Sequence, residues 1–329
     1  MMVSRRDLTT MLCLLPVVLG NPARAAGQAS GYPTRPVKLV VPYAAGGGTD
    51  AIARLVAQGV GELLGQSLIV ENNGQSGGNL ATQQAALAAP DGYTMLMANQ
   101  GPMVVNPHLF KSVKIDPLKA FDPVTLIASV PLLAVVPKSS QFSSLRELVE
   151  FGQKNPGKLT YGSAGNGSAS HLAAVLFLQQ AKIDAVHVPY RGAGPAINDL
   201  LGGQLDFMIT TVPSVLGQVQ GQIVKALATT SAKRVPHFAA IPTVAECGWP
   251  DYSAAAWYGF VVPKGTPPAV VAKLRDATIK AINNPTLRER LATEGAEPIG
   301  NEPGEFAAMM ERESAMWSNV IKAAGIKID

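Results

Sequence analysis

Short apolar runs alternate with helical stretches along most of this chain, and this alternation constrains the fold more than any other feature. Strands are expected at 37–41, 67–70 and 93–97, where the runs are short and apolar. Helical spacing of apolar residues over 49–64 and 79–88 places a helix between successive strands. Apolar strands separated by helices predict a parallel, doubly wound α/β sheet.

A second set of strand–helix units lies between two long apolar stretches. These stretches, 121–136 and 252–262, are each expected to cross between two lobes. The pattern predicts helices at 144–154, 168–180, 195–201, 267–283, 285–294 and 303–324, and strands at 158–161, 185–188, 206–209 and 225–228. We therefore predict two doubly wound α/β lobes joined by two crossing strands, with a ligand cleft between them. Lobe 1 would be residues 32–129 plus 256–329, and lobe 2 residues 130–255.

The N-terminus has the three parts of a cleavable export signal. Arg5 and Arg6 precede an apolar run over 11–19, and small residues lead to Ala25. The run is too short to cross a bilayer, so we expect residues 1–25 to be removed and the mature protein to be soluble. A buried N-terminal strand or helix is the alternative. The paired arginines resemble a twin-arginine signal, but Leu8 replaces the usual Phe, so both Sec and twin-arginine export stay open.

Charge and cysteine content exclude several classes of protein. The formal net charge is only +4 over 329 residues, and no Lys/Arg cluster interleaves with aromatic residues, so we expect no nucleic-acid partner. Cys13 would leave with the signal, and Cys247 would then be the only thiol. This excludes an intrachain disulfide and a cysteine-rich zinc site. The four histidines lack metal-ligand spacing, and we expect neither metal nor cofactor.

Four predicted strands are each followed by a loop of small and polar residues and then by a helix start. These loops are 44–49, 74–79, 162–168 and 191–195. The first N–H groups of a helix lack intrahelical partners and carry partial positive charge, and such loops gather beyond the carboxyl ends of parallel strands. Several helix starts around one cleft predict an anion site built mainly from backbone donors. Alternatively, each loop is only a tight, capped connection.

Nucleotide-binding and catalytic motifs fail in detail. The first loop has no Lys for a P-loop, and Asp50 would repel an anion unless it points away and braces the loop. The sequence around Ser76 matches Gly-x-Ser-x-Gly, but three residues separate it from its strand, whereas a nucleophile elbow turns sharply. Ser163 or Ser168 with His171 and Asp206 would form a triad on residue type alone. We predict that the protein is not an enzyme.

Four side chains near the loops leave alternatives open. His171, in the first turn of a predicted helix, is placed either to reach the cleft or to cap and pack. Arg191 is placed either to pair with a ligand carboxylate or to form a salt bridge with a loop acid. Trp257 and Tyr258, in the second crossing stretch, are core residues or ligand platforms, of which the first is the commoner role.

Several motifs together carry a resemblance to a known family. The opening stretch is YPTRPVKLVVPYAAGGGTD over 32–50, and further matches are DGYT at 91–94, YGSAGNGS at 161–168, HL at 171–172, VPYRG at 188–192, DLLGGQ at 199–204, PTVAE at 242–246, WYG at 257–259 and GTP at 265–267. From about residue 32 to the C-terminus, the chain resembles the Bug proteins of the TctC family. These are the substrate-binding components of tripartite tricarboxylate transporters.

The resemblance implies a periplasmic binding-protein fold, type II-like, that closes on its ligand. Family members bind di- and tricarboxylates, acidic amino acids and aromatic acids, through backbone donors and ordered water more than through charged side chains. It implies a periplasmic, non-enzymatic receptor that delivers a small carboxylate to the membrane subunits of a tripartite tricarboxylate transporter. We expect a monomer, the default for a receptor that must open and close. A ligand-sensing module for a membrane sensor kinase is the second hypothesis. A periplasmic hydrolase using Ser76 or Ser168 with His171 is the third.

By position, the resemblance also assigns ligand contacts in both lobes. In lobe 1 they are Tyr43, Ala44, Gly46, Gly47, Gly48, Gly78, Asn79, Asn99 and Gln100. In lobe 2 they are Ser163, Ala164, Asn166, Gly167, Ser168, His171, Arg191, Thr210 and Thr211. The chain departs from the family pattern at 71–78, where ENNGQSGG replaces Glu-Asn-Arg/Lys-Pro-Gly-Ala-Gly-Gly and so lacks a basic residue and a proline.

Overall fold

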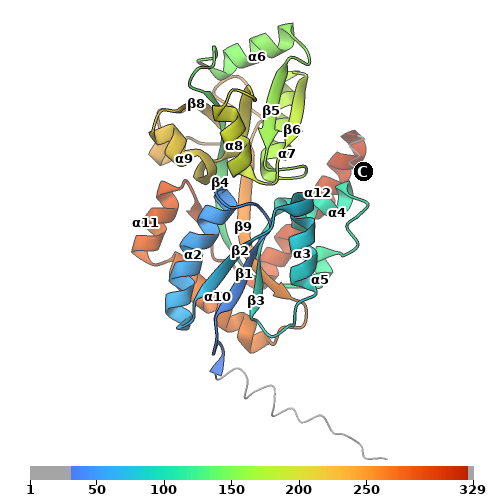
Figure 1. The fold of residues 1–329 in the computed structure, drawn as a ribbon, viewed down its shortest axis with the longest axis vertical. Helices are drawn as coiled ribbons and strands as arrows, with labels where there is room; N and C mark the ends of the chain where they lie inside the picture. Colours follow the sequence, from blue (N-terminus) through green and yellow to red (C-terminus); the bar gives the residue numbers. More distant parts are fainter. Residues whose placement is uncertain (1–30, 325–329) are drawn as a thin grey trace, which may run out of the picture. The chain divides into compact units, whose positions relative to one another are not determined.

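The long strand β4 (Phe121–Pro137) joins the two halves of the molecule (Figure 1). The computed structural model describes residues 31–324, so the predicted signal peptide lies outside the described residues. From Phe121 to Pro131, β4 pairs with β9 (Ala255–Pro263), and from Leu132 onward it pairs with β7 (Phe207–Thr211) and β8 (Val224–Thr229). The curled sheet that results continues from one half into the other.

We call the first half, with its helices, the first lobe. Its strand order is β2-β1-β3-β9-β4. The parallel strands are β1 (Val37–Val41), β2 (Leu68–Asn72) and β3 (Thr94–Asn99). The short β10 (Glu297–Pro298) pairs with β4. The helices are α2 (Gly48–Leu64), α3 (Asn79–Ala86), α4 (Asn106–Leu109), α5 (Pro117–Ala120), α10 (Pro268–Ile282), α11 (Pro285–Thr293) and α12 (Pro303–Ala324), with short turns at Gln75–Gly78 and Gly101–Val105.

The second lobe repeats the arrangement around the other half of β4. Its strand order is β6-β5-β7-β4, and β8 also pairs with β4. The remaining strands are β5 (Leu159–Ser163) and β6 (Ala185–Pro189). The helices are α6 (Leu145–Lys154), α7 (Ala169–Ala181), α8 (Ala193–Leu201) and α9 (Val212–Gln220), and a short turn spans Pro236–Phe238.

The two-lobed α/β fold predicted from the alternation is confirmed, with two corrections. The sheet is mixed and not purely parallel, because β9 runs antiparallel to both β3 and β4. Helix α9 was not predicted, because it follows β7 directly without a glycine loop and is only nine residues long. The lobe boundaries at 129/130 and 255/256 stay a prediction.

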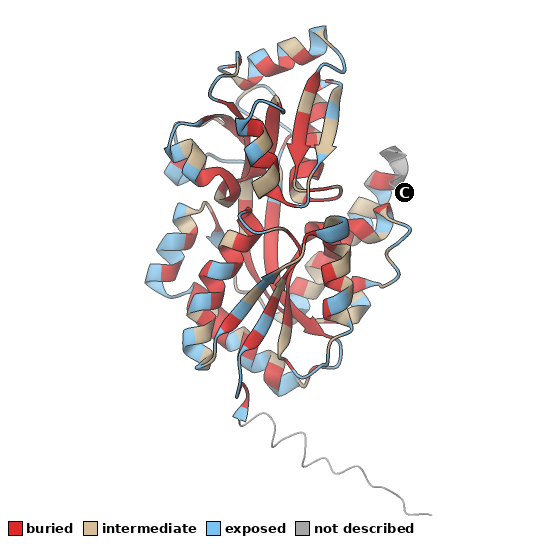
Figure 2. Cartoon of the chain, in the orientation of Figure 1, coloured by how far each residue is buried: buried red, intermediate tan, exposed pale blue. Residues whose placement is uncertain are grey.

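The apolar pattern of the crossing strands explains their position. All residues of β9 except Ala255 are buried, and nearly all residues of β4 from Val124 onward are buried (Figure 2). Helices from both lobes pack against these strands. In the first lobe, Phe306 of α12 meets the Trp257 ring edge-on at a centroid distance of 5.5 Å. In the second, Tyr252 packs against Phe177 of α7, and its hydroxyl donates to Ala173 O over 2.9 Å.

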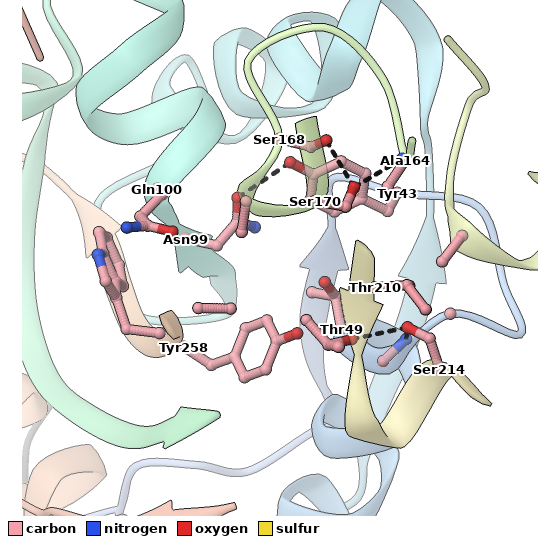
Figure 3. A pocket seen from close by; sticks show the side chains of 17 residues that line it. Tyr43, Thr49, Asn99, Gln100, Ala164, Ser168, Ser170, Thr210, Ser214 and Tyr258 are labelled. Atoms are coloured by element: carbon pink, nitrogen blue, oxygen red, sulfur yellow. Dashed lines mark hydrogen bonds between the residues drawn. The ribbon is translucent and has the colours of Figure 1, made fainter. Parts of the chain in front are cut away.

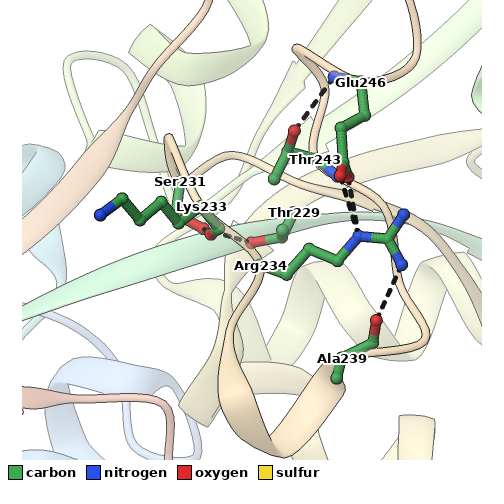
Figure 4. A network of polar contacts seen from close by, with 7 residues as sticks. All are labelled: Thr229, Ser231, Lys233, Arg234, Ala239, Thr243 and Glu246. Atoms are coloured by element: carbon green, nitrogen blue, oxygen red, sulfur yellow. Dashed lines mark hydrogen bonds and ion pairs between the residues drawn. The ribbon is translucent and has the colours of Figure 1, made fainter.

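A polar network orders the long connection from β8 to β9 (Figure 4). Arg234 Nε donates to both carboxylate oxygens of Glu246, at 3.0 and 2.9 Å, and its Nη1 donates to Ala239 O. Glu246 in turn accepts from Thr243 N and donates through its own N–H to Thr243 Oγ1. This connection therefore leads into the crossing strand with a fixed conformation.

We expect Gly259→Ala to destabilise the fold, because a Cβ there would stand 2.6 Å from Phe306 Cε1 and 3.0 Å from Thr125 O. Overpacking of this kind costs about 1–3 kcal/mol of unfolding free energy, which urea denaturation measures. Gly217→Ala is the matched control: nothing lies within 4 Å of its added Cβ in α9, and we expect a gain of about 0.5–1 kcal/mol. Equal stability of the two variants would contradict this packing account.

Candidate functional site

A small cavity lies between the two lobes, at the carboxyl ends of the parallel strands (Figure 3). Its volume is about 40 Å³. Its lining residues come from the ends of strands, from the loops that follow them and from β9. They are Tyr43, Gly47, Gly48, Thr49, Asn99, Gln100, Ala164, Ser168, Ala169, Ser170, Ala193, Thr210, Thr211, Ser214, Ala256, Trp257 and Tyr258.

Four helices begin at this cavity. Helix α2 enters with Gly48 as its first residue, α7 with Ala169, α8 with Ala193 and α9 with the turn that contains Ser214. These helices have 17, 13, 9 and 9 residues, and each directs its N-terminal N–H groups and the positive end of its dipole toward the same space. One helix belongs to the first lobe and three to the second, so the positive potential comes from both sides.

The charged residues of the surrounding loops do not line the cavity. Among the described residues that line it, none is Asp, Glu, Lys, Arg or His. Asp50 points away, as predicted: its Oδ1 lies 2.9 Å from Arg54 Nε, and its Oδ2 accepts from Gly46 N at 3.1 Å. A bound anion would therefore meet dipoles and hydroxyls and no countercharge.

Hydroxyl groups supply most of the polar side-chain surface of the cavity. Thr210 is 1% exposed, and its Oγ1 has no hydrogen-bond partner among the described residues, which leaves a buried donor available to a ligand. Tyr43 OH donates to Asn99 Oδ1 over 3.3 Å. Burial raises the pKa of both Tyr43 and Tyr258, so both phenols remain protonated donors.

Direct contacts between the lobes enclose the cavity. Ala44 N donates to Arg191 O over 3.0 Å, and Gly48 N donates to Ser214 Oγ over 2.7 Å. Ser214 Oγ also lies 2.7 Å from Thr211 Oγ1. A Cβ on Gly48 would overlap the Thr211 hydroxyl, so this glycine permits the close approach of α2 to the second lobe. The conformation described is the closed one.

The structure brings many of the predicted contacts to the cavity wall. They are Tyr43, Gly47, Gly48, Asn99, Gln100, Ala164, Ser168, Thr210 and Thr211. The other predicted contacts are not among the lining residues. They are Ala44, Gly46, Gly78, Asn79, Ser163, Asn166, Gly167, His171 and Arg191. Ligand contact by any of these residues stays a prediction.

The residues away from the wall hold the loops in place. Gly46 and Gly78 have φ of +82° and +86°, which favour glycine, and Gly78 precedes α3. Asn79 Oδ1 accepts from Asn106 Nδ2 over 2.6 Å. Arg191 is exposed, and its carbonyl bonds to Ala44 N.

His171 lies behind the 162–168 loop and supports it. Its Nδ1 accepts from Gly167 N over 3.2 Å, and its ring stacks on His187 with centroids 4.2 Å apart. Burial lowers the pKa of His171 to about 4, and burial together with His171 lowers that of His187 to about 3. His187 Nε2 lies 2.6 Å from Ser163 Oγ.

The proposed serine triad is not assembled. Ser168 Oγ donates to Gly165 O over 2.6 Å and caps α7 by accepting from His171 N. Asp206 Oδ2 accepts from Thr160 N and Thr160 Oγ1. Neither group meets the His171 imidazole in the way that a nucleophile and its orienting acid would.

Sequence reasoning missed several lining residues. The hydroxyls of Thr49, Ser170 and Ser214 lie in the first turns of their helices, where Ser and Thr usually indicate caps. Trp257 and Tyr258 are buried at 4% and 3% exposure, as core residues are, and they also line the cavity. A Pro-Ser pair four residues after a predicted strand, as at Pro213–Ser214 after 206–209, was the available signal for α9.

The two-lobed fold with a cavity at the strand ends is that of the periplasmic binding proteins. A family model described as "Tripartite tricarboxylate transporter family receptor" (TctC) matches residues 52–326, and the chain belongs to this family. Protein BugT of Bordetella pertussis is 32% identical over 324 residues, covering 98% of this chain and 99% of that protein.

Two solved structures with the same fold are named together with a bound carboxylate. "R. palustris Rpa4515 with adipate" is 35% identical, covers 90% of this chain and 100% of that chain, and has a TM-score of 0.87. MatC from Rhodopseudomonas palustris "with bound malate" is 33% identical, and the match covers 88% of this chain and 100% of that chain, with a TM-score of 0.83. In the part of the chain that the structure describes, no helix is long and apolar enough to span a membrane.

The stacked histidines predict a loss of stability in mild acid. Their pKa values are lower in the folded than in the unfolded state, so the unfolded chain binds more protons below about pH 6.5. Each histidine should lower the unfolding free energy by about 2 kcal/mol between pH 7 and pH 5, and the pair by roughly 4 kcal/mol, as urea denaturation at both values would measure. His187→Gln should reduce this dependence, whereas His237→Gln, on the surface, should keep it. An unchanged dependence in His187→Gln would contradict the assignment.

Proposed function

We propose that this protein is an exported periplasmic receptor that captures a small carboxylate between its lobes. It would deliver the ligand to the membrane subunits of a tripartite tricarboxylate transporter, without catalysing a reaction. The cavity carries this proposal, because four helix starts and a buried, unpartnered threonine hydroxyl surround a space without charged side chains.

A carboxylate suits this cavity better than a cation or a neutral sugar. The N–H groups and dipole ends of four helices favour negative charge, and the buried, unpartnered Thr210 hydroxyl adds a donor. A cation would meet the positive ends of these dipoles and no carboxylate. The adipate and malate in the names of two structural relatives support the same class of ligand.

Transport is favoured over sensing by the family to which the chain belongs, since its description names a transporter receptor. Deletion of the gene in its host should abolish uptake of the ligand. A deletion strain with normal uptake but no transcriptional response to the ligand would favour the sensor-kinase hypothesis.

We expect a thermal-shift screen to respond to carboxylates and not to their neutral analogues. At a hundredfold excess over Kd, a ligand that binds the native state stabilises it by about 2.7 kcal/mol. The panel should pair hexanoate with hexanamide, adipate with adipamide and malate with its dimethyl ester, with glucose as an uncharged control. Equal shifts for each acid and its neutral analogue, or no response to any acid, would contradict the proposal.

The close contact of Gly48 with the second lobe predicts a specific effect of Gly48→Ala. The added Cβ would overlap the Thr211 hydroxyl and stand 2.9 Å from Ser214 Oγ, both in the second lobe. We therefore expect ligand affinity to fall at least about tenfold, while the unfolding temperature without ligand changes little. Calorimetric titration with the ligand found in the screen would measure this.

Gly217→Ala, in α9 but outside the cavity lining, is the matched control for that variant. Nothing lies within 4 Å of its added Cβ. Affinity close to that of the wild type is expected. If Gly48→Ala also binds like the wild type, the closed contact between α2 and α9 does not accompany ligand binding.

A further inference from the structure

The enclosed cavity is too small for most carboxylic acids. A buried water needs at least about 10–15 Å³, so a volume of about 40 Å³ holds roughly three waters. That is the size of one carboxylate group. Any larger acid must extend beyond the wall of this cavity.

A second, larger cavity adjoins the first between α7 and α12. Its volume is about 390 Å³, within the range of small-molecule sites. Apolar side chains form most of its surface, with Leu172, Val175 and Leu176 on α7. On the opposite side, α12 contributes Met316, Trp317 and Ile321. Figure 1 shows the end of α12 rising toward the second lobe, and α7 and α12 both line the cavity.

The two cavities share part of their lining. Gln100 and Ala169 line both cavities. Trp257 lines the first, and its Nε1 donates over 2.8 Å to Oε2 of Glu313, which lines the second. Glu313 also shares a hydrogen bond with Gln100. Gln100 therefore lies at the boundary of both cavities, hydrogen-bonded to a residue of the larger one.

The larger cavity selects against a second negative charge. Glu313 is the only Asp, Glu, Lys or Arg among its described lining residues, and it offers no countercharge to an anion. His171, which also lines this cavity, is neutral near pH 7 because burial lowers its pKa to about 4. Burying an unpaired carboxylate here would be costly, whereas an aliphatic or aromatic group would be stabilised by burial.

We infer that the ligand is a monocarboxylic acid with an apolar body. Its carboxylate would occupy the cavity at the helix starts, and its body would pass Gln100 into the apolar cavity between α7 and α12. This inference rests on the proposed function, because the head group must first bind at the helix starts.

A homologous series of acids tests the inference by calorimetric titration of the purified protein. Each buried methylene strengthens binding about fourfold, so hexanoate should bind about fiftyfold more tightly than propionate. Hexanoate should also bind more tightly than adipate, which has the same chain length and a second carboxylate. Hexanol should bind weakly, because it lacks the anionic head group.

A large side chain that fills the apolar cavity should distinguish the binding contribution of the ligand's body from that of its carboxylate. Val175→Trp should weaken hexanoate binding at least tenfold and leave propionate unchanged. Met316→Trp, at a position 48% exposed on α12, gives a second variant with the same expected effect. Leu87→Trp, at a surface position outside both cavities, is the matched control and should bind both acids like the wild type.

Different outcomes distinguish the inference from the proposed function. Equal affinity for propionate and hexanoate, tighter binding of adipate than of hexanoate, or an equal effect of Val175→Trp on both acids would overturn the inference and leave the receptor proposal standing. Hexanol binding as tightly as hexanoate would overturn it too, because the cavity would then be an independent apolar site. Binding of no carboxylate of any length would overturn both.

Discussion

The convergence of four helix N-termini on one enclosed space is the constraint on which the rest of the structure depends. Positive dipole ends from both lobes meet there, and no charged side chain in the described lining offsets them. Without an anion, these ends oppose close approach of the lobes. With an anion between them, the same dipoles attract it from both sides. In the receptor that we propose, the electrostatics of the cavity would thus couple ligand binding to closure.

The contacts that enclose the cavity also keep it free of formal charge. Asp50, the acid nearest the first helix start, is turned outward by its ion pair with Arg54 and its bond to Gly46 N. Arg191 contributes its backbone carbonyl to closure, while its side chain is exposed. Backbone and hydroxyl donors require no countercharge in the empty state. Buried charged side chains would need one, because an unpaired buried charge is strongly destabilising.

Periodicity predicted most of the fold, because strands and helices differ in the spacing of their apolar residues. It gave no direction for the crossing strands, so the antiparallel pairing of β9 with β3 and β4 was not predicted. The short α9, which follows β7 without a glycine loop, was not predicted either. The glycine loops indicated the right edge of the sheet. They could not show which loop residues face inward. Gly47 and Gly48 line the cavity, whereas Gly78 and Asn79, which were predicted on the same grounds, do not. Ser214 was missed because it lies in α9, the helix that periodicity did not predict.

The most direct test of the account is a high-resolution crystal structure with a bound carboxylate. The account predicts carboxylate oxygens about 2.7–3.2 Å from N–H groups at the starts of α2, α7, α8 or α9. It also predicts a contact to Thr210 Oγ1 and no Lys, Arg or His side chain within hydrogen-bonding distance of the carboxylate. A carboxylate paired with Arg191 or another cation, or bound away from the helix starts, would contradict it.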